Sequence, residues 1–212
     1  MSIFTKKIDP VLEHKKNLFE KIGIIIRQNS KILDVGCGNG LDARLVSKRA
    51  NIVLGIDKSF NKEWIMQKSN LANKLFFSVA DAKSLPFKDN NFDFVFAKDV
   101  LHHVDNPYEI IKEIKRTTKI GGTIIIIEAN RYNPIFYLHM TKMCGHNHLT
   151  KGNFMNLITE NFSNVEFKFV ESHVWPTNNK FITLLLHKIE KILDRILFCR
   201  PFLAYNIAII KI

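Results

Sequence analysis

The stretch that decides the fold is Lys31-Ile32-Leu33-Asp34-Val35-Gly36-Cys37-Gly38-Asn39-Gly40-Leu41. Its apolar first half predicts a buried strand, its glycines predict a sharp turn, and its last residue predicts the beginning of a helix. In a sheet built from alternating strands and helices, ligands bind at the carboxyl ends of the strands, where such a turn lies. Residues 36–40 are therefore the first candidate binding site.

Strand-like and helix-like segments alternate around this stretch over the first 130 residues. We expect strands at 31–35, 52–56, 75–79, 92–97 and 123–128, and helices at 10–28, 41–49, 61–73 and 107–118. Neighbouring parallel strands require crossover helices, so this order predicts an α/β fold with a doubly wound, mostly parallel sheet.

The last third of the chain follows a different rhythm, with helices expected at 134–143, 151–161 and 179–198 and strands at 165–171 and 205–211. The long helix carries apolar residues at helical spacing with basic residues among them: Ile182, Leu185, Leu186, Ile189, Ile192, Leu193 and Ile196, beside Lys188, Lys191 and Arg195. The simplest interpretation is that this stripe packs against the sheet. The alternative is that 181–198 contacts an anionic membrane or covers a lipid-like acceptor.

The composition is that of one globular domain. With 212 residues, 46% of them hydrophobic and 24% charged, the chain is neither collagen-like nor of low complexity. Three cysteines without paired spacing argue against a disulfide framework and for a reducing compartment. No apolar run reaches the ~20 residues that cross a bilayer, and residues 1–16 lack the apolar centre of a signal peptide. We therefore expect a cytoplasmic protein.

The net charge of +11 is spread along the chain rather than gathered in a basic arm. It supports attraction to an anionic partner without identifying one, and a lysine-rich solvated surface is the simpler explanation.

The glycine turn does not match the known phosphate-binding loops. The dinucleotide fingerprint Gly-x-Gly-x-x-Gly, counted from Gly36, would need its third glycine at Leu41. A Walker loop would end in Gly-Lys-Ser or Gly-Lys-Thr, which is absent from the sequence. A carboxylate just before the turn, at Asp34, would repel phosphate and suit a ligand with a cationic group. The turn therefore favours a ligand without phosphates.

Two further acids follow the next predicted strands. Asp57 comes after the second strand, where a carboxylate can accept from both hydroxyls of a ribose. Asp81 comes after the third strand and could accept from an adenine amino group. Each alone is most simply a helix cap, but acids at three consecutive strand ends predict a nucleoside site.

Together these motifs resemble the class I S-adenosylmethionine-dependent methyltransferases of the small-molecule and lipid-quinone type. The resemblance covers residues 30–130 and rests on Asp34–Gly40, Asp57, Ala80-Asp81-Ala82, Leu85-Pro86-Phe87, Phe92-Asp93-Phe94-Val95, Leu101-His102-His103-Val104 and Gly121-Gly122-Thr123. It implies a Rossmann-like, seven-stranded sheet whose last strand is antiparallel. It also implies one domain, with an N-terminal helix in 1–30, a cofactor-binding core at 31–130 and acceptor-side elements in 131–212.

The resemblance further implies S-adenosyl-L-methionine as cofactor and S-adenosyl-L-homocysteine as product. Gly36 and Gly38 would approach the methionine part, Asp57 the ribose, and Asp81 with the Ala82 amide the adenine. The full set of cofactor-binding residues implied is Asp34, Gly36, Cys37, Gly38, Gly40, Asp57, Lys58, Asp81, Ala82 and Lys98.

Methyl transfer from a sulfonium needs the acceptor held in line with the methyl group and shielded from water. A base helps only when the acceptor arrives protonated. By resemblance the loop after the fourth strand lies near the methyl group, which makes Asp99, His102 and His103 the candidate catalytic residues. The simpler alternative is that one of the paired histidines packs against, or caps, the following helix.

The segment after the fifth strand carries the candidate acceptor-side residues. Arg131 could meet an anionic acceptor and Tyr132 could line its pocket, although an ordinary Asn- and Pro-rich turn is the alternative. The nearby Cys144, His146 and His148 have the residue types of a metal site. A zinc site needs three or four protein ligands, and the sequence offers no second cluster. We therefore expect no metal, and a loop bordering the acceptor site instead.

Two other functions remain open. The high isoelectric point, about 9.6, allows an RNA or DNA methyltransferase. The sequence nevertheless shows no strong sign of nucleic-acid binding, since it lacks an appended binding domain, a concentrated basic patch and an Asn/Asp-Pro-Pro-Tyr motif. The other alternative is a protein that binds S-adenosylmethionine without catalysis. The leading hypothesis is a methyltransferase acting on a small-molecule or lipid-linked acceptor.

Overall fold

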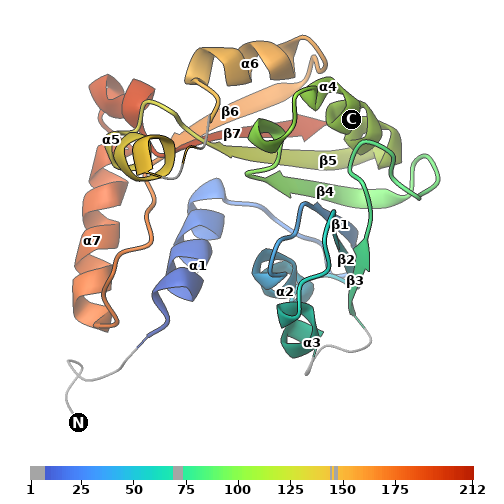
Figure 1. Ribbon diagram of the computed structural model, residues 1–212, viewed down its shortest axis with the longest axis horizontal. Coiled ribbons are helices and arrows are strands. Elements are labelled where there is room, and N and C mark those ends of the chain that lie inside the picture. The colour runs from blue at the N-terminus through green and yellow to red at the C-terminus, as the bar shows by residue number, and fades with distance from the viewer. Residues whose placement is uncertain (1–7, 69–73, 144, 146–147) are drawn as a thin grey trace. The chain divides into compact units, whose positions relative to one another are not determined.

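The computed structural model describes residues 8–68, 74–143, 145 and 148–212 (Figure 1). The chain divides into two compact units. The larger unit comprises Ile25–Glu128, Gly152–Phe167 and Ala208–Ile212, and the smaller comprises Met1–Ile24, Ala129–Lys151 and Lys168–Ile207. The two units are described separately below.

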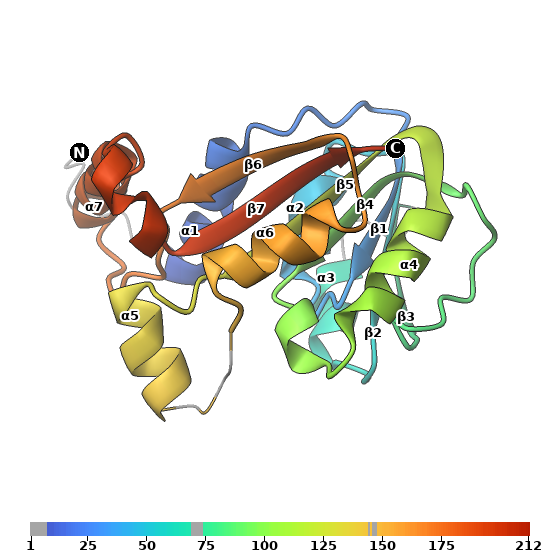
Figure 2. The same cartoon turned by 90° about the horizontal axis from the view of Figure 1, so that it is seen from above.

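The sheet has seven strands in the order β3-β2-β1-β4-β5-β7-β6. Their bounds are β1 Lys31–Val35, β2 Ile52–Asp57, β3 Leu75–Val79, β4 Phe92–Lys98, β5 Thr118–Ala129, β6 Val165–Val170 and β7 Tyr205–Lys211. β1 to β5 pair in parallel, while β7 runs antiparallel to β5 and β6 (Figure 2). The predicted doubly wound, mostly parallel sheet with an antiparallel last strand is confirmed.

The helices of the larger unit connect its parallel strands. They are α2 Leu41–Ser47, α3 Glu63–Lys68, the 3₁₀ turn η2 Leu101–His103, α4 Pro107–Thr117 and, apart from its first residue, α6 Lys151–Thr159. Asn106 caps α4 by accepting from the Tyr108 amide (3.3 Å), and Pro107 fills the first turn, as the sequence predicts. Of the helix expected at 61–73, residues 69–73 lie outside the described part of the chain.

The smaller unit contains α1 Pro10–Ile22, α5 Pro134–Phe136, the π-helical turn η3 Tyr137–Met143, α7 Lys180–Leu193 and the 3₁₀ turn η4 Leu197–Phe202. The prediction that the first helix reaches residue 28 is wrong. Gly23 adopts a left-handed conformation (φ 70°) and its amide donates to the Phe19 carbonyl, which ends α1 at Ile22.

The core of the larger unit lies around β1, β4 and β5. Most of their apolar side chains are fully buried, including Ile32, Leu33, Val95 and the run Ile124–Ile127, whereas Ile120 near the start of β5 is exposed. Such continuous burial is expected for strands covered on both faces of a parallel sheet. The three strands therefore form a rigid support for the loops at their carboxyl ends.

The prediction that the apolar stripe of the long helix packs against the sheet is wrong. Ile182, Leu185, Ile189, Ile192 and Ile196 are exposed, whereas the buried residues of α7 are Thr183 and Glu190. Helical spacing shows that residues share a face but does not show whether that face is covered. Among the helices that the structure describes, none is both long and apolar enough to cross a membrane.

Candidate active site

A cavity of about 440 Å³ opens at the carboxyl ends of β1 to β4 in the larger unit. Four loops contribute to it: the glycine turn after β1, and the segments that follow β2, β3 and β4. Its lining residues are Gly36, Gly38, Ile56, Asp57, Lys58, Ala80, Asp81, Ala82, Asp99, Val100, His103, Val104 and Ile110. The cavity lies where parallel α/β sheets bind their ligands.

Two glycines of the turn serve different purposes. A Cβ atom on Gly36 would lie 2.4 Å from Cγ2 of Val100, so this glycine lets the turn pack closely against the loop after β4. A Cβ atom on Gly38 would meet nothing within 4 Å. Both residues have positive φ angles, 69° and 52°, which glycine adopts readily. Gly38 therefore exposes bare main chain to the cavity, where a ligand can approach it.

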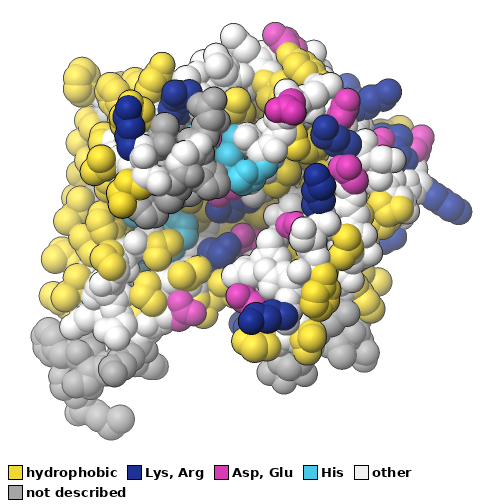
Figure 3. All heavy atoms as spheres, viewed as in Figure 1, with side chains coloured by type: hydrophobic (Ala, Val, Ile, Leu, Met, Phe, Trp, Pro, Cys, Tyr) yellow, Lys and Arg dark blue, Asp and Glu magenta, His cyan; other side chains and the backbone are white. Residues whose placement is uncertain are grey.

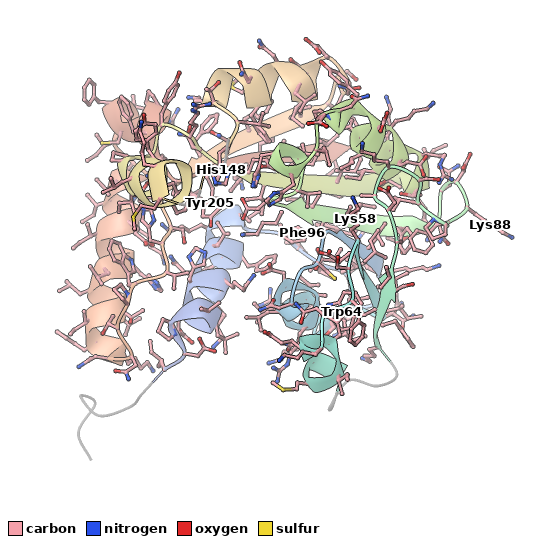
Figure 4. All side chains as sticks on the ribbon, viewed as in Figure 1. Lys58, Trp64, Lys88, Phe96, His148 and Tyr205 are labelled. Carbon is pink, nitrogen blue, oxygen red and sulfur yellow. The ribbon has the colours of Figure 1, made fainter. Side chains whose placement is uncertain are left out.

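The turn is held from two sides. The Gly38 amide donates to Oδ2 of Asp57 (2.8 Å), and the Gly38 carbonyl accepts from Nε1 of Trp64 (2.8 Å). Trp64 comes from α3 (Figure 4) and stacks on Phe77, with ring centroids 5.2 Å apart. The Phe77 ring in turn lies against Gly40, where a Cβ atom would be 2.4 Å from it. Gly40 thus serves the packing of the turn.

Sequence reasoning did not find the role of Trp64. Its only local signal is an apolar ring on a short polar helix, and its partners Gly38 and Phe77 are distant in sequence.

Three carboxylates line the cavity: Asp57, Asp81 and Asp99. Asp57 also accepts from the Ser59 amide (3.3 Å), and Asp81 accepts from the Lys83 amide (2.9 Å), so each side chain is oriented by its own turn. Asp34 is buried and does not line the cavity. The third acid at the cavity is therefore Asp99 rather than Asp34.

Cys37 is a buried thiol beneath the turn. Burial is the largest cause that raises its pKa, and the nearby carboxylates of Asp34 and Asp57 raise it further. The thiol therefore stays protonated at neutral pH, which excludes it as a nucleophile.

The loop after β4 begins with an ion pair between Lys98 and Asp99. Asp99 has a positive φ of 54°, which is uncommon for a residue with a side chain, and its amide donates to the Ile127 carbonyl (2.8 Å). The sharp bend at Asp99 brings its carboxylate to the cavity wall.

Glu128, at the end of β5, holds the next part of this loop. Its Oε1 accepts from the amides of Val100 (2.9 Å) and Leu101 (2.7 Å), and its Oε2 shares a hydrogen bond with Nδ1 of His102 (2.7 Å). Burial raises the pKa of the Glu128 carboxyl, while the hydrogen bond to His102 opposes that increase. The sequence pattern shows Glu128 only as a strand end, because the groups it binds lie about 26 residues earlier.

The three candidate catalytic residues are therefore placed differently. Asp99 and His103 line the cavity, whereas the His102 side chain is buried against Glu128. The two histidine rings lie 4.0 Å apart between centroids. This geometry gives His102 a structural partner and gives His103 access to the cavity.

The cavity collects most of the expected cofactor residues. Those that line it are Gly36, Gly38, Asp57, Lys58, Asp81 and Ala82, while Asp34, Cys37, Gly40 and Lys98 are not among its lining residues. Sequence reasoning missed the apolar wall formed by Ile56, Val100, Val104 and Ile110. These residues read as ordinary core positions in the sequence.

The candidate acceptor-side residues belong to the smaller unit. The Tyr132 amide donates to Oδ1 of Asn130 (3.2 Å), and the Tyr132 side chain is exposed. The Arg131 amide donates to the Leu149 carbonyl (3.2 Å). Of the residues with metal-ligand chemistry, Cys144 and His146 lie outside the described part of the chain, and His148 is buried.

A sequence model of the methyltransferase domain family matches residues 33–126, the segment that builds every wall of this cavity. Residues 33–126, somewhat less than half of the chain, are thus similar to the methyltransferase domain family.

The curated relatives of this chain are named for the methylation of varied molecules. It is 31% identical over 108 residues to a 27-O-demethylrifamycin SV methyltransferase of Amycolatopsis mediterranei, which covers 48% of this chain and 39% of the relative. It is 36% identical over 102 residues to a chloroplastic tocopherol O-methyltransferase of Arabidopsis thaliana, which covers 46% of this chain and 29% of the relative. The chain thus spans less than half the length of these curated relatives.

The chain also shares its fold with solved structures. One is the phosphoethanolamine N-methyltransferase 2 of Haemonchus contortus in complex with S-adenosyl-L-methionine, with a TM-score of 0.64 and 19% identity. That match covers 92% of this chain and 52% of the other. At this identity the likeness concerns the fold alone.

Proposed function

We propose that the protein transfers a methyl group from S-adenosyl-L-methionine to a small-molecule or lipid-linked acceptor. The observation that carries the proposal is the cavity at the strand ends, which combines bare main chain at Gly38 with the carboxylates of Asp57, Asp81 and Asp99. Carboxylates around a cavity favour a cationic ligand and disfavour phosphates. This chemistry fits a sulfonium nucleoside with an amino group.

The cavity residues suggest how the cofactor is held. Asp57 is proposed to accept from the ribose hydroxyls, and Asp81 with the Ala82 amide to bind the adenine. The main chain at Gly36 and Gly38 would face the methionine part. Asp57 already binds the Gly38 amide through Oδ2, so one carboxylate would link the ribose to the shape of the turn.

S-adenosyl-L-methionine supplies a methyl group on a positively charged sulfur, so the protein need not generate a reactive centre. Its own residues must hold the acceptor in line and exclude water. The apolar wall of Val100, Val104 and Ile110 is suited to excluding water.

A proton acceptor is needed only for an acceptor such as a hydroxyl. We assign the role of proton acceptor to His103, which lines the cavity. Asp99 is less suited to it, because its carboxylate is ion-paired with Lys98. His102 and Glu128 are proposed to position the loop that carries Asp99 and His103.

The acceptor class rests on the relatives, which are named for the methylation of a rifamycin precursor and of tocopherol. We propose that residues 31–130 hold the cofactor and that 131–212, including Arg131 and Tyr132, contribute to acceptor recognition within one domain. A cytoplasmic location, expected from the cysteine content, belongs to the same proposal.

The test is incubation of the protein with S-adenosylmethionine labelled on the methyl group and with fractionated cell extract. We expect label in a lipid or small-molecule fraction, and none with a variant carrying Asp57→Ala. Label in RNA or protein would overturn the acceptor class. Binding of S-adenosylmethionine without transfer to any fraction would support the non-catalytic alternative.

A further inference from the structure

The outward side of α7 is apolar and its inward side is polar, which is the reverse of an ordinary surface helix. Thr183 and Glu190 are 4% and 1% exposed, whereas Ile192 is 59% exposed. Phe181, Ile182, Leu184, Leu185, Ile189 and Ile196 are exposed as well. In Figure 3, hydrophobic side chains are gathered along α7.

The inward side is fixed by a buried network within the smaller unit. Glu190 accepts from Nδ2 of Asn17 (2.7 Å), the His173 amide (3.0 Å) and Nε1 of Trp175 (2.8 Å). Lys21 lies 3.5 Å from the same carboxylate. Rotating α7 to bury its apolar side would leave these groups without their partners, at a cost of several kcal/mol.

Asp194, just after α7, repeats this arrangement. It pairs with Lys21 at 2.9 Å and accepts from the Glu171 amide at 2.6 Å. The two acids nearest the end of the helix are thus both turned inward, and the apolar side is held outward.

The outward apolar surface continues past the helix into η4. Leu197 and Phe198 are 69% and 85% exposed, and Phe202 is exposed too. A contiguous apolar surface of this kind is unfavourable in water and marks a site of contact with something apolar. We call residues 181–202 on this side the α7–η4 surface.

The charge of this surface indicates what contacts it. Lys180, Lys188, Arg195 and Arg200 are exposed, while Glu190 and Asp194, the acids of segment 180–202, face the buried network. A second copy of the same surface would bring positive charges against positive charges, which disfavours a dimer. An anionic bilayer would complement both the apolar and the basic residues.

We propose that the α7–η4 surface docks the protein on an anionic lipid bilayer, with the helix lying in the interface. Short apolar helices with basic neighbours bind membranes in this manner. The proposal concerns where the protein resides and does not depend on which acceptor it methylates.

The first test is flotation of the full chain with vesicles of phosphatidylcholine alone and with vesicles that contain phosphatidylglycerol. We expect binding to the anionic vesicles, and a loss of about tenfold or more in the variant with Ile189→Glu and Ile192→Glu. The matched control is Ile65→Glu on α3, which is 69% exposed and outside the surface. The control should bind as the unchanged protein does.

The second test separates charge from apolar contact. A variant with Lys188→Gln, Arg195→Gln and Arg200→Gln should bind anionic vesicles about tenfold or more weakly at low salt. In a Phe198→Trp variant, anionic vesicles should shift the added tryptophan emission to shorter wavelength. Circular dichroism and S-adenosylmethionine binding show whether each variant is folded.

Three results would overturn the proposal. One is the absence of binding to anionic vesicles, and another is equal binding by the Ile189→Glu, Ile192→Glu variant. The third is a combination of two observations. The unchanged protein forms a stable dimer in light scattering but does not bind vesicles, and the Ile189→Glu, Ile192→Glu variant is monomeric. Failure of methyl transfer would leave vesicle binding measurable, so the two proposals fail separately.

Discussion

At the scale of single residues, two glycines of the turn are required for different reasons, one for packing and the other for access to the cavity. Gly36 has Val100 against it, while Gly38 faces open space. Both backbones are left-handed, which costs a residue with a Cβ atom about 1–2 kcal/mol. Only Gly36 would add a steric clash to that cost.

We therefore expect Gly36→Ala and Gly38→Ala to differ in urea unfolding. Gly36→Ala should lose about 2–5 kcal/mol of unfolding free energy, since overpacking adds about 1–3 kcal/mol. Gly38→Ala should lose only about 1–2 kcal/mol of unfolding free energy, the cost of a left-handed backbone. It should also weaken S-adenosylmethionine binding. A second change, Val100→Ala, should restore part of the stability of Gly36→Ala. Equal losses in the two glycine variants would contradict this assignment.

The Asp57 carboxylate is expected to bind the cofactor and to hold the turn. Asp57→Ala should weaken S-adenosylmethionine binding more than tenfold in calorimetry, with the domain still folded by circular dichroism. Asp57→Asn keeps an oxygen that can accept from the Gly38 amide. It should preserve the turn and lose less affinity than Asp57→Ala. Unchanged affinity in both variants would remove the ribose assignment.

At the scale of elements, Arg116 on α4 clamps the loop between β3 and β4. Its guanidinium donates to the carbonyls of Phe87 (2.8 Å) and Leu85 (3.0 Å) and pairs with Asp89 (2.7 Å). Glu113, one turn earlier, pairs with Arg116 (2.7 Å) and accepts from the Leu85 amide (2.8 Å). These contacts fix the loop that leads away from Asp81 and Ala82.

This clamp gives a pH-dependent prediction. The pairing with Arg116, followed by the Leu85 amide, lowers the pKa of the Glu113 carboxyl below its ordinary value, despite some desolvation. Its stabilising effect is therefore present above the unfolded pKa and is lost as pH falls through the lower folded pKa. In urea unfolding, Glu113→Gln should cost about 1–2 kcal/mol at pH ~7 and progressively less as the pH falls below the ordinary pKa of glutamate.

The control for this prediction is Glu109→Gln on the same helix. Glu109 pairs with Lys83 at 3.4 Å in a largely exposed position, so its loss should hardly change stability. A Glu113→Gln effect that stayed constant with pH would contradict the ionic explanation.

The sequence predicts most of the strands, because apolar runs and turn residues are local signals. It also indicates that Gly38, Asp57 and Asp81 lie at strand ends, and all three line one cavity in the structure. It does not predict Trp64, Arg116 or Glu128, because each acts on main-chain groups 26 to 31 residues away. The sequence also does not predict the orientation of α7, because the spacing of apolar residues does not identify which side of the helix is buried.

At the scale of the whole molecule, the two units share strands, because β6 and β7 contribute residues to both. The chain passes between the units at residues 24–25, 128–129, 151–152, 167–168 and 207–208. A chain that crosses so often is expected to unfold as one cooperative domain. This agrees with the single domain proposed above.

Lys21→Met tests that cooperativity from within the smaller unit. The change leaves the buried Glu190 and the half-buried Asp194 without their cation and should cost about 3–5 kcal/mol. Calorimetry should show one transition at a lower temperature, with S-adenosylmethionine binding in the larger unit lost in the same transition. The control Lys16→Met, on the same helix, removes an exposed pair with Glu13 and should have little effect. Two separate transitions would contradict the single domain.

The buried thiol beneath the turn has a consequence for the cell. Peroxide and electrophiles attack the thiolate form of cysteine, and burial keeps Cys37 in the thiol form. Oxidative stress would therefore spare Cys37, so that this residue would not couple the proposed methyl transfer to the redox state of its surroundings.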